Sequence, residues 1–571
     1  MNYLFVCIFC IISKLLPAQT QEFIPLSSSF YTQIDALYQI YGLGSPSSVR
    51  PWTKAEALII LKRLDPAQMT PELVPVYDTL YKEAAAPLRF SLGDSVRMDA
   101  HVMLALELYT HSNTSDFVNE EDWLKGYAQR APFTKLDLNL SLGNWFYLTS
   151  DIRYSWNFNS QGQDSYCTPT GIGALIPQTG AEEYPIRTFA AAFAQRFTLN
   201  IPPQTLDIDC IFPKRAFLSF GGAHWNFSFG RESLQWGNGQ SGNFLIGSHR
   251  DFDNFVRFAA FYDKFRYDLL MTIYDKYNYD GSGEKSRYFM LHRLEFRVLP
   301  QLVLSLSENI MYQDAYFNIR YLNPAFIYHN WDESDLFNAL AHLELDFAFA
   351  PHWNFYLQGA LDQARAPNES DSEADAWGIL GGIEYAHALT FGKRNAVLNL
   401  SLEGAYTSPV LYRRDRVDFM ILNRRISFNE GNVYALEYIG YQYGGDALVA
   451  QFDAHLTVLN KGEAGVRLFA MAHGEMNAFM SHNTEGDNTD RANIIHTTPS
   501  GDTVETSFAV SLWGTYTLPP VFKWLSLSVF SQLDIIAKTN KRMYQNNPPF
   551  VWYKSGTSTD LQYSLGVQLR W

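Results

Sequence analysis

Apolar and polar residues alternate through long stretches of this chain, and this period of two constrains its fold more than any other feature. Leucine occupies every second position of residues 136–142, and Asp137, Asn139 and Ser141 lie between the leucines. Such a period places successive side chains on opposite faces of a β-strand. The same pattern returns in segments 98–109, 343–361, 508–533 and 561–571. We therefore predict that the chain is mostly antiparallel β-sheet from about residue 90 onward.

The polar face of these stretches carries formal charges in mid-strand, at Glu107, Asp151, Glu344, Asp346 and Asp453. A soluble β-sandwich alternates in a similar way, because one face of each sheet meets water. Two features favour a transmembrane barrel. The stretches last about 9 to 13 residues, whereas strands of soluble sheets usually have about five or six. Aromatic residues make up 15% of the chain, and membrane barrels use such residues in girdles at both interfaces.

The length of the β-region predicts the size of the barrel. At about 25 to 30 residues per strand with its connection, residues 90–571 provide 16 to 20 strands, and we expect about 18. Gly143-Asn144 predicts a tight turn of the short, periplasmic kind. Polar segments 157–184, 364–376 and 482–504 are expected to be extracellular loops.

Both ends of the chain indicate export to the outer membrane. Residues 3–12 form an apolar run of signal-peptide length, so residues 1–20 are predicted to be a signal peptide. Its removal leaves Cys167 and Cys210, and the sequence leaves their pairing open. The alternation that ends at Trp571 resembles the C-terminal signature by which barrel-assembly machinery recognises its substrates.

A small helical head precedes the barrel. Apolar residues recur at helical spacing from Phe30 to Ile40, and glycines follow. Thr53 and Glu56 have the spacing of a capping box, in which each side chain caps the backbone of the other residue. Thr70 with Pro71 predicts the start of a third helix. We expect residues 28–86 to be a head or periplasmic plug that leans on the barrel at 90–571, because so small a unit has little core of its own.

Several other classes of protein are excluded or disfavoured. A net charge of −15 without a basic stripe argues against nucleic acid as a partner. Gly237 to Gly242 match G-x-G-x-x-G, but between β-type segments, so we expect sharp bends instead of a nucleotide site. No metal-ligand or cofactor motif is present, so neither a metal nor a cofactor is expected. An outer-membrane hydrolase or acyltransferase using Ser228 or Ser305 with His292 or His101 remains an alternative.

Residues 230–254, GRESLQWGNGQSGNFLIGSHRDFDN, are the most distinctive segment. This segment resembles the capsule-assembly Wzi family, and segments 50–64, 292–309, 320–331 and 438–448 are also similar to it. The resemblance implies an outer-membrane β-barrel of about 18 strands whose helical head closes the periplasmic mouth. It also implies a protein that binds capsular polysaccharide and helps to attach it to the cell surface, without catalysis.

The same region supplies side chains suited to sugars, whose C–H faces stack on aromatic rings and whose hydroxyls bond polar groups. We expect a carbohydrate site among Arg231, Gln235, Trp236, Asn238, His249, Arg250, Asp253, His329, Asn330 and Trp331. The alternative is a structural role, with Arg231 paired to Glu232 or another lumen acid and the tryptophans in a girdle. The expected protein is a monomer in contact with outer-membrane lipid and surface polysaccharide. A porin-like solute channel is the main rival function.

Overall fold

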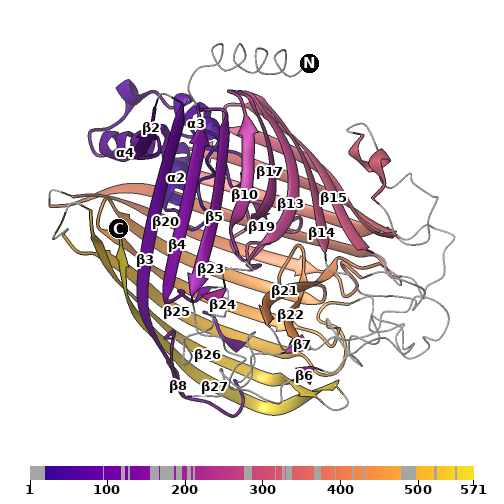
Figure 1. Cartoon of the computed structure of the whole chain (residues 1–571). Helices are drawn as coiled ribbons and strands as arrows, with labels where there is room; N and C mark the ends of the chain where they lie inside the picture. The colour runs from indigo at the N-terminus through magenta and orange to yellow at the C-terminus, as the bar shows by residue number, and fades with distance from the viewer. Residues whose placement is uncertain are drawn as a thin grey trace.

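The computed structural model describes residues 20–93, 95–117, 122–125, 129–154, 166–167, 186–187, 196–201, 208–209, 213–274, 286–314, 317–323, 328, 337–364, 374–392, 394–413, 417–428, 431–476, 497–519, 522, 524–546 and 549–571. Its main feature is an antiparallel barrel of 18 strands (Figure 1). In chain order these strands are β3 (Val96–His111), β4 (Thr134–Leu142), β5 (Phe146–Tyr154), β10 (Ala216–Gly221), β11 (Trp225–Glu232), β13 (Asp253–Phe261), β14 (Phe265–Tyr274), β15 (Ser286–Leu299), β16 (Leu302–Asp314), β17 (Phe337–Ala350), β18 (Trp353–Gln363), β19 (Ala376–Phe391), β20 (Arg394–Thr407), β23 (Ala447–Val458), β24 (Gly462–His473), β25 (Glu505–Thr517), β26 (Ser526–Asn546) and β27 (Pro549–Arg570).

The barrel closes between its last strand and its first. β27 pairs with β3 in the register Gln562↔His111 to Arg570↔Met103. The backbones of Trp571 and Val102 add two reciprocal hydrogen bonds of 3.0 Å at the end of this seam. Closure gives each of the 18 strands a hydrogen-bonded neighbour on both sides, and strands that cross lipid require such pairing. The predicted fold class and strand number are therefore confirmed.

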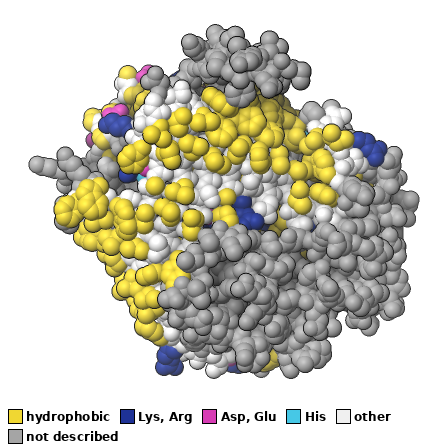
Figure 2. Space-filling model, in the orientation of Figure 1, with side chains coloured by type: hydrophobic (Ala, Val, Ile, Leu, Met, Phe, Trp, Pro, Cys, Tyr) yellow, Lys and Arg dark blue, Asp and Glu magenta, His cyan; other side chains and the backbone are white. Residues whose placement is uncertain are grey.

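The alternation predicted from the sequence separates an outer from an inner face. On β3, Leu106 is 49% exposed whereas Glu107 is fully buried. Leucines 138, 343 and 561 likewise lie on the outside, and Asn139, Glu344 and Gln562 lie on the inside. Figure 2 shows hydrophobic side chains covering much of the described outer surface. Lipid thus meets an apolar surface while the charges of each strand face the lumen.

The two ends of the barrel differ in the length of their connections. Eight turns at the end that carries the helices, here called the head-side mouth, are short and include 143–145, 262–264, 300–301 and 518–525. Most connections at the far end, such as 155–215 and 315–336, are long. Exposed aromatic side chains surround the head-side mouth: Trp225, Tyr262, Phe296, Phe349, Trp353, Phe391, Tyr516, Phe522, Trp524 and Trp571. This belt fits the girdle predicted from the aromatic content.

Three helices form the head at one end of the barrel (Figure 1): α2 (Phe30–Ile40), α3 (Lys54–Lys62) and α4 (Val74–Ala85). Within the described residues, no helix combines the length and apolarity needed to cross a bilayer. A 3-10 turn, Pro66–Gln68, lies between α3 and α4. Gly42, with φ of 64°, ends the first helical segment as predicted.

Two details of the helix prediction need correction. Thr53 Oγ1 accepts from the Glu56 backbone at 3.1 Å, but the Glu56 carboxylate binds Arg266 of the barrel and so does not return to the cap. The third helix begins at Val74 with Pro75 in its first turn. The backbone carbonyl of Thr70 instead accepts the Leu73 backbone N–H at 2.9 Å, in a turn that precedes the helix. Tertiary contact explains the first difference, because a buried arginine requires a carboxylate partner.

The remaining elements are short or lie beside the barrel. β1 (Val49–Arg50) pairs with β12 (Gln235–Trp236), and β2 (Phe90–Leu92) pairs antiparallel with the start of β3. β21 (Met420–Phe428) and β22 (Gly431–Tyr438) form a separate hairpin. The others are β6 (Tyr166–Cys167), β7 (Ile186–Arg187), β8 (Phe197–Leu199), β9 (Ile208–Asp209) and the 3-10 turn Ile319–Leu322. The predicted signal peptide and Cys210 lie outside the described residues, except for Thr20.

Candidate functional site

A segment of the chain crosses the lumen between β11 and β13. Residues 233–252, here called the lumen strap, leave the barrel wall after Glu232 and return at Asp253. Within the strap, β12 pairs with β1 of the head segment, with Val49 opposite Trp236 and Arg50 opposite Gln235. The strap is therefore joined to the head by backbone pairing as well as by side chains.

The strap reaches the opposite wall of the barrel. The backbone N–H groups of Gln240 and Ser241 donate to the two carboxylate oxygens of Glu403 at 2.6 and 2.7 Å. Gln240 also donates from Nε2 to Glu384 at 3.1 Å, and its carbonyl accepts from Gln451 at 3.2 Å. Glu384, Glu403 and Gln451 belong to β19, β20 and β23, about half the ring of strands away from β11.

Glycines give the strap its path. Gly237 has φ of 134°, and a Cβ there would lie 2.2 Å from Asn243 Oδ1. Gly242 has φ of 151°, and a Cβ there would lie 2.7 Å from the Tyr441 ring. Glycine alone adopts such positive φ values readily and leaves room for these contacts. The prediction that the glycine motif serves sharp bends and close approaches is confirmed.

Two other inward segments cover the strap on its apolar side. Tyr412, from the connection after β20, donates from its hydroxyl to the Phe244 carbonyl at 2.9 Å and accepts from the Tyr441 backbone at 3.0 Å. Phe244, Leu245, Tyr412 and Tyr441 are all buried in one apolar cluster. Gly247 donates its N–H to the Ile439 carbonyl at 2.9 Å, which adds a backbone contact. Burial of this apolar surface stabilises the strap inside the barrel.

Trp236 is part of this buried packing. Its side chain is fully buried, against Val49 and near Phe23 in the same cluster. The Arg257 guanidinium lies 5.6 Å from its ring centroid. A ring that is covered in this way presents no face to a sugar, so Trp236 holds the strap and the head together in this structure.

Arg250 and Asp253 form a closed, buried pair with Tyr274. Arg250 donates to both carboxylate oxygens of Asp253, at 2.6 and 2.9 Å, and to the Tyr274 hydroxyl at 3.0 Å. The Tyr274 hydroxyl donates to Asp253 at 3.1 Å. The paired geometry fixes the end of the strap where β13 begins, since bidentate arginine–carboxylate pairs are strong and directional.

The other described residues of the predicted carbohydrate site do not converge on one point. Arg231 lies on the outer face of β11, where it donates to Asn254 at 2.9 Å and to the Pro213 carbonyl at 2.9 Å. Glu232 pairs instead with Arg215, at 2.6 Å. Asn238 accepts from Gln358 at 3.1 Å inside the lumen, and His249 Nε2 lies 3.0 Å from the Tyr438 carbonyl. Gln235 is partly exposed beside Arg50; His329, Asn330 and Trp331 lie outside the described residues.

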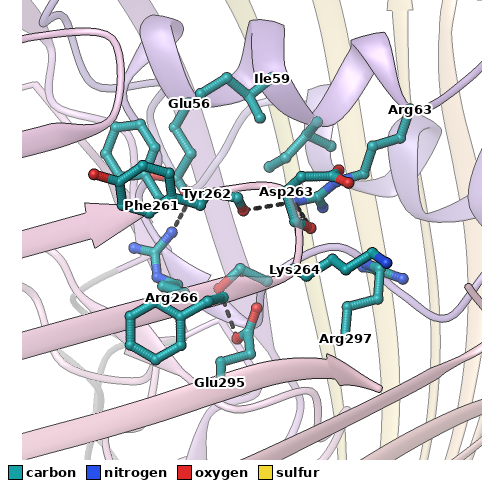
Figure 3. A pocket seen from close by; sticks show the side chains of 13 residues that line it. Glu56, Ile59, Arg63, Phe261, Tyr262, Asp263, Lys264, Arg266, Glu295 and Arg297 are labelled. Atoms are coloured by element: carbon teal, nitrogen blue, oxygen red, sulfur yellow. Dashed lines mark hydrogen bonds and ion pairs between the residues drawn. The ribbon is translucent and has the colours of Figure 1, made fainter. Parts of the chain in front are cut away.

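The head docks on the barrel through two ion pairs at the head-side mouth, of which Arg266–Glu56 is buried and Arg63–Asp263 is exposed. Figure 3 shows Glu56 of α3 pointing toward Arg266 of β14, and Arg63, which follows α3, pointing toward the turn between β13 and β14. Arg63 donates to Asp263 at 3.0 Å and to the Tyr262 carbonyl at 3.1 Å, and Arg266 pairs with Glu56. These residues line a small recess at the head-side mouth.

The linker between α2 and α3 carries a second set of docking contacts. Ser45 N–H donates to Asp346 at 2.6 Å, Ser47 hydroxyl to Glu295 at 2.9 Å and Ser48 hydroxyl to Glu344 at 2.6 Å. Within the head, Arg50 pairs with Asp35 at 2.5 Å. Burial raises the pKa of the Asp35 carboxyl, and the charge of Arg50 opposes that rise. The charges of the lumen wall on this side are thus used to hold the head.

Glu344, Glu384 and Glu403 anchor the head and strap, and they were absent from the predicted site. Their alternation with outward apolar residues was the available signal, because it assigns each of them to the lumen. Among the described residues, no group of three or more histidine, cysteine, aspartate or glutamate side chains has an arrangement suited to a metal ion. The arrangement is therefore one of hydrogen bonds and ion pairs around inward segments.

A closed barrel with an apolar exterior, a polar lumen and segments folded into that lumen defines an outer-membrane β-barrel protein. The family described as "Capsule assembly protein Wzi" matches residues 187–512, more than half of the chain. The chain belongs to this family, as its resemblance predicted.

The solved Wzi of Escherichia coli, described as an outer-membrane protein involved in group 1 capsule assembly and a carbohydrate-binding β-barrel, has the same fold. It is 14% identical, with a TM-score of 0.54, over 96% of this chain and 98% of that one. The channel DcaP of Acinetobacter baumannii is a weaker likeness, at 9% identity and a TM-score of 0.32 over 85% of this chain and 100% of that one. OccAB1 of the same organism has 8% identity and a TM-score of 0.37 over 83% and 96% of the two chains. No curated protein sequence matches the chain.

Proposed function

We propose that this protein is a non-enzymatic component of the outer membrane that binds capsular polysaccharide and helps to assemble it on the cell surface. Membership of the Wzi family supports this proposal. The solved member of the family from Escherichia coli, which shares the fold over nearly the whole chain, is described as binding carbohydrate and as acting in capsule assembly. The polysaccharide is thus the proposed partner, with outer-membrane lipid around the barrel.

The orientation of the barrel belongs to the same proposal. Short turns of outer-membrane barrels face the periplasm and long connections face outward. The head at residues 28–86 then closes the periplasmic mouth as a plug, and the long connections of the far end meet the capsule. The protein works as a monomer, and the alternating segment that ends at Trp571 serves recognition by the barrel-assembly machinery.

The observation that carries the proposal is the strap that crosses the lumen. A solute channel needs a continuous water-filled path, whereas here backbone groups of Gln240 and Ser241 bind the far wall through Glu403. The apolar cluster around Phe244 and Tyr441 fills the space beside the strap. A plugged barrel is suited to holding a ligand at the membrane surface and poorly suited to passing it through.

The predicted carbohydrate contacts divide into two groups in this proposal. Arg231, Gln235, Asn238 and His249 keep partial exposure and remain proposed contacts, together with His329, Asn330 and Trp331. Trp236, Arg250 and Asp253 are buried and bonded within the protein, so we propose that they position the strap.

A deletion in the native host tests the function. We expect loss of the protein to move surface polysaccharide from the cells into the medium, and restoration of the wild-type chain to return it. The measurement is the polysaccharide in washed cells and in the supernatant. The Glu72→Gln variant, changed at an exposed position of the head, is the complementation control. Equal retention by the deletion strain and the parent would contradict the proposal.

A solute channel is the second candidate, because side chains of the inner wall on β24 keep solvent exposure. Arg467 and Glu463 have side chains 41% and 37% exposed. Single-channel recording of the purified barrel in a planar bilayer separates the two functions. A persistent large conductance of the wild-type protein would favour the channel, and a closed baseline would favour the capsule function.

A further inference from the structure

The small recess at the head-side mouth has an excess of positive charge. It lies where α3 meets the turn between β13 and β14, on the side of the barrel that carries the head (Figure 3). Arginine and lysine side chains in its lining outnumber the carboxylates by four to three. The cations are Arg63, Lys264, Arg266 and Arg297, and the acids are Glu56, Asp263 and Glu295.

The acids of the recess have partners within the protein. Two of them pair with arginines of the same recess, as described above. The third, Glu295, accepts a hydrogen bond from the Ser47 hydroxyl at 2.9 Å. Among the residues that the structure describes, neither Lys264 nor Arg297 forms an ion pair with a carboxylate. The excess charge of the recess therefore resides on these two side chains.

Lys264, in the turn before β14, lies opposite Arg297 of β15. The Arg297 backbone N–H donates to the Lys264 carbonyl at 3.0 Å, next to the register pair Phe265↔Phe296. Like charges placed opposite each other in this way destabilise a strand pair. The Arg297 guanidinium donates to two carbonyls of the linker between α2 and α3, at 2.8 Å each, but these groups are uncharged. Figure 3 shows both side chains extending to the same side of the recess, where an anion would relieve their repulsion.

The recess adjoins the aromatic belt of the outer surface. Phe265 lines the recess, and the centroid of its ring lies 5.3 Å from that of Phe296. Phe296 is 40% exposed, and Tyr262, which also lines the recess, is 54% exposed. Aromatic rings of such a belt lie at the level of the lipid headgroups. A headgroup at this level comes within reach of the exposed Lys264, because a long lysine stem lets its charge extend to the interface.

We propose that an anionic phospholipid binds at this recess, with its phosphate beside Lys264 and Arg297 and its acyl chains against the outer wall near Phe296. Basic pockets at membrane-protein surfaces recognise anionic headgroups in this way. Asp263 is 70% exposed and opposes an anion, but Arg63 pairs with it at 3.0 Å. The site rests on the orientation given under the proposed function, which places this mouth in the periplasmic leaflet, and it adds a lipid partner for the junction of head and barrel.

The test uses the full-length protein folded in detergent and two lipid probes, phosphatidylglycerol as the anionic lipid and phosphatidylcholine as the zwitterionic one. Native mass spectrometry measures the fraction of protein that carries each lipid, for the wild type, Lys264→Gln, Lys264→Arg and Lys461→Gln. Lys461 is the matched control, because it lies at the same mouth, in the short turn between β23 and β24, and outside the recess. Heat-modifiable gel migration verifies that each variant is a folded barrel.

We expect the wild type to bind phosphatidylglycerol at least about fivefold more tightly than phosphatidylcholine. Lys264→Gln should lose about fivefold in affinity for phosphatidylglycerol, which is the usual contribution of one cation near anionic lipid. Lys264→Arg keeps the charge and should bind like the wild type, and so should Lys461→Gln. Equal binding of the two lipids by the wild type, or unchanged binding by Lys264→Gln, would overturn the site. Displacement of the lipid by inorganic phosphate alone would also overturn it, because it would identify a site for free phosphate.

These measurements are independent of the capsule experiment, because a detergent micelle has no periplasmic and outer sides. If the deletion strain releases its capsule while Lys264→Gln binds phosphatidylglycerol normally, the proposed function stands and the lipid site fails. If the deletion strain retains its capsule while the wild type selects phosphatidylglycerol through Lys264, the lipid site stands and the proposed function fails.

Discussion

At the scale of single residues, the lumen is organised by buried arginines that each bind several partners. Arg293 of β15 donates to Glu344 at 2.9 Å, to the Ser48 hydroxyl at 2.7 Å and to the Ser305 hydroxyl at 2.8 Å. Arg257 donates to Asp268 at 3.0 Å and to the Pro51 carbonyl at 2.9 Å. A buried charge without such partners would be strongly unfavourable. The arginines therefore fix the head in one position relative to the wall.

Trp236 is expected to stabilise the folded protein. We expect Trp236→Ala to lower the free energy of unfolding by about 3–5 kcal/mol, since it removes a fully buried ring and leaves a cavity. Denaturant unfolding of the barrel in detergent, followed by gel migration, measures this change. Trp353→Ala, at an exposed position of the head-side belt, is the control and should change stability much less. A Trp236→Ala barrel as stable as the control would refute the structural role.

Trp513 and Trp236 show what the sequence alone can and cannot predict. The alternation of Phe508, Val510 and Leu512 with polar positions puts Trp513 on the inner face, and the structure agrees. The alternation says nothing about what covers an inner face. Trp236 stands next to Gly237 in an irregular segment, and its burial depends on Val49, nearly 190 residues away in the chain. Long-range packing of this kind has no local signature.

At the scale of elements, the strap depends on backbone geometry that only glycine adopts readily. We expect Gly237→Ala to displace the strap, because the methyl group would collide with Asn243 and the backbone has positive φ. Hydrogen exchange should be at least tenfold faster at the amides of Gln240 and Ser241, which donate to Glu403. Gly359→Ala is the matched control, since a Cβ at Gly359 meets nothing within 4 Å. Unchanged protection in Gly237→Ala would mean that the strap tolerates the strain.

The seam between α3 and the barrel gives a second test at this scale. Glu56→Gln removes the charge that faces Arg266, which keeps only Asp268 as a carboxylate partner. We expect the head to undock more often, so that protease cleaves the segment between α3 and α4 several times faster than in the wild type. Glu72→Gln changes an exposed glutamate of the same head and should leave the cleavage rate unchanged. Equal rates in the two variants would mean that the Glu56 ion pair does not secure the head.

At the scale of the whole molecule, the barrel was predictable and its contents were not. The strand period, the strand length and the aromatic ends together specify a transmembrane barrel, because each follows from local chemistry at a lipid boundary. The inward course of residues 233–252 is set by contacts such as Gln240 to Glu403, which join distant parts of the chain. The glycine motif signalled unusual backbone there. Its direction across the lumen required the three-dimensional arrangement.

The head and the strap are two obstructions in one path, and this arrangement predicts the conductance of truncated forms. The head contacts the mouth from β13 to β20, while the strap spans the barrel deeper inside. Deleting residues 28–86 should therefore raise the single-channel conductance above the wild-type baseline, although less than in an open porin, because the strap still binds Glu403. The same deletion combined with Gly237→Ala should give a larger, persistent conductance.

Planar-bilayer recordings of the four proteins, wild type, deletion, Gly237→Ala and the combination, distinguish this arrangement from its rivals. If the deletion alone already conducts as much as the combination, the strap does not restrict the path. If neither change raises the conductance, residues 28–86 are not the plug, and the closure must be made by the connections at the far end. An increase greater than the sum of the single changes is the result expected of obstructions in series, because the obstruction that remains limits the current when only the other has been removed.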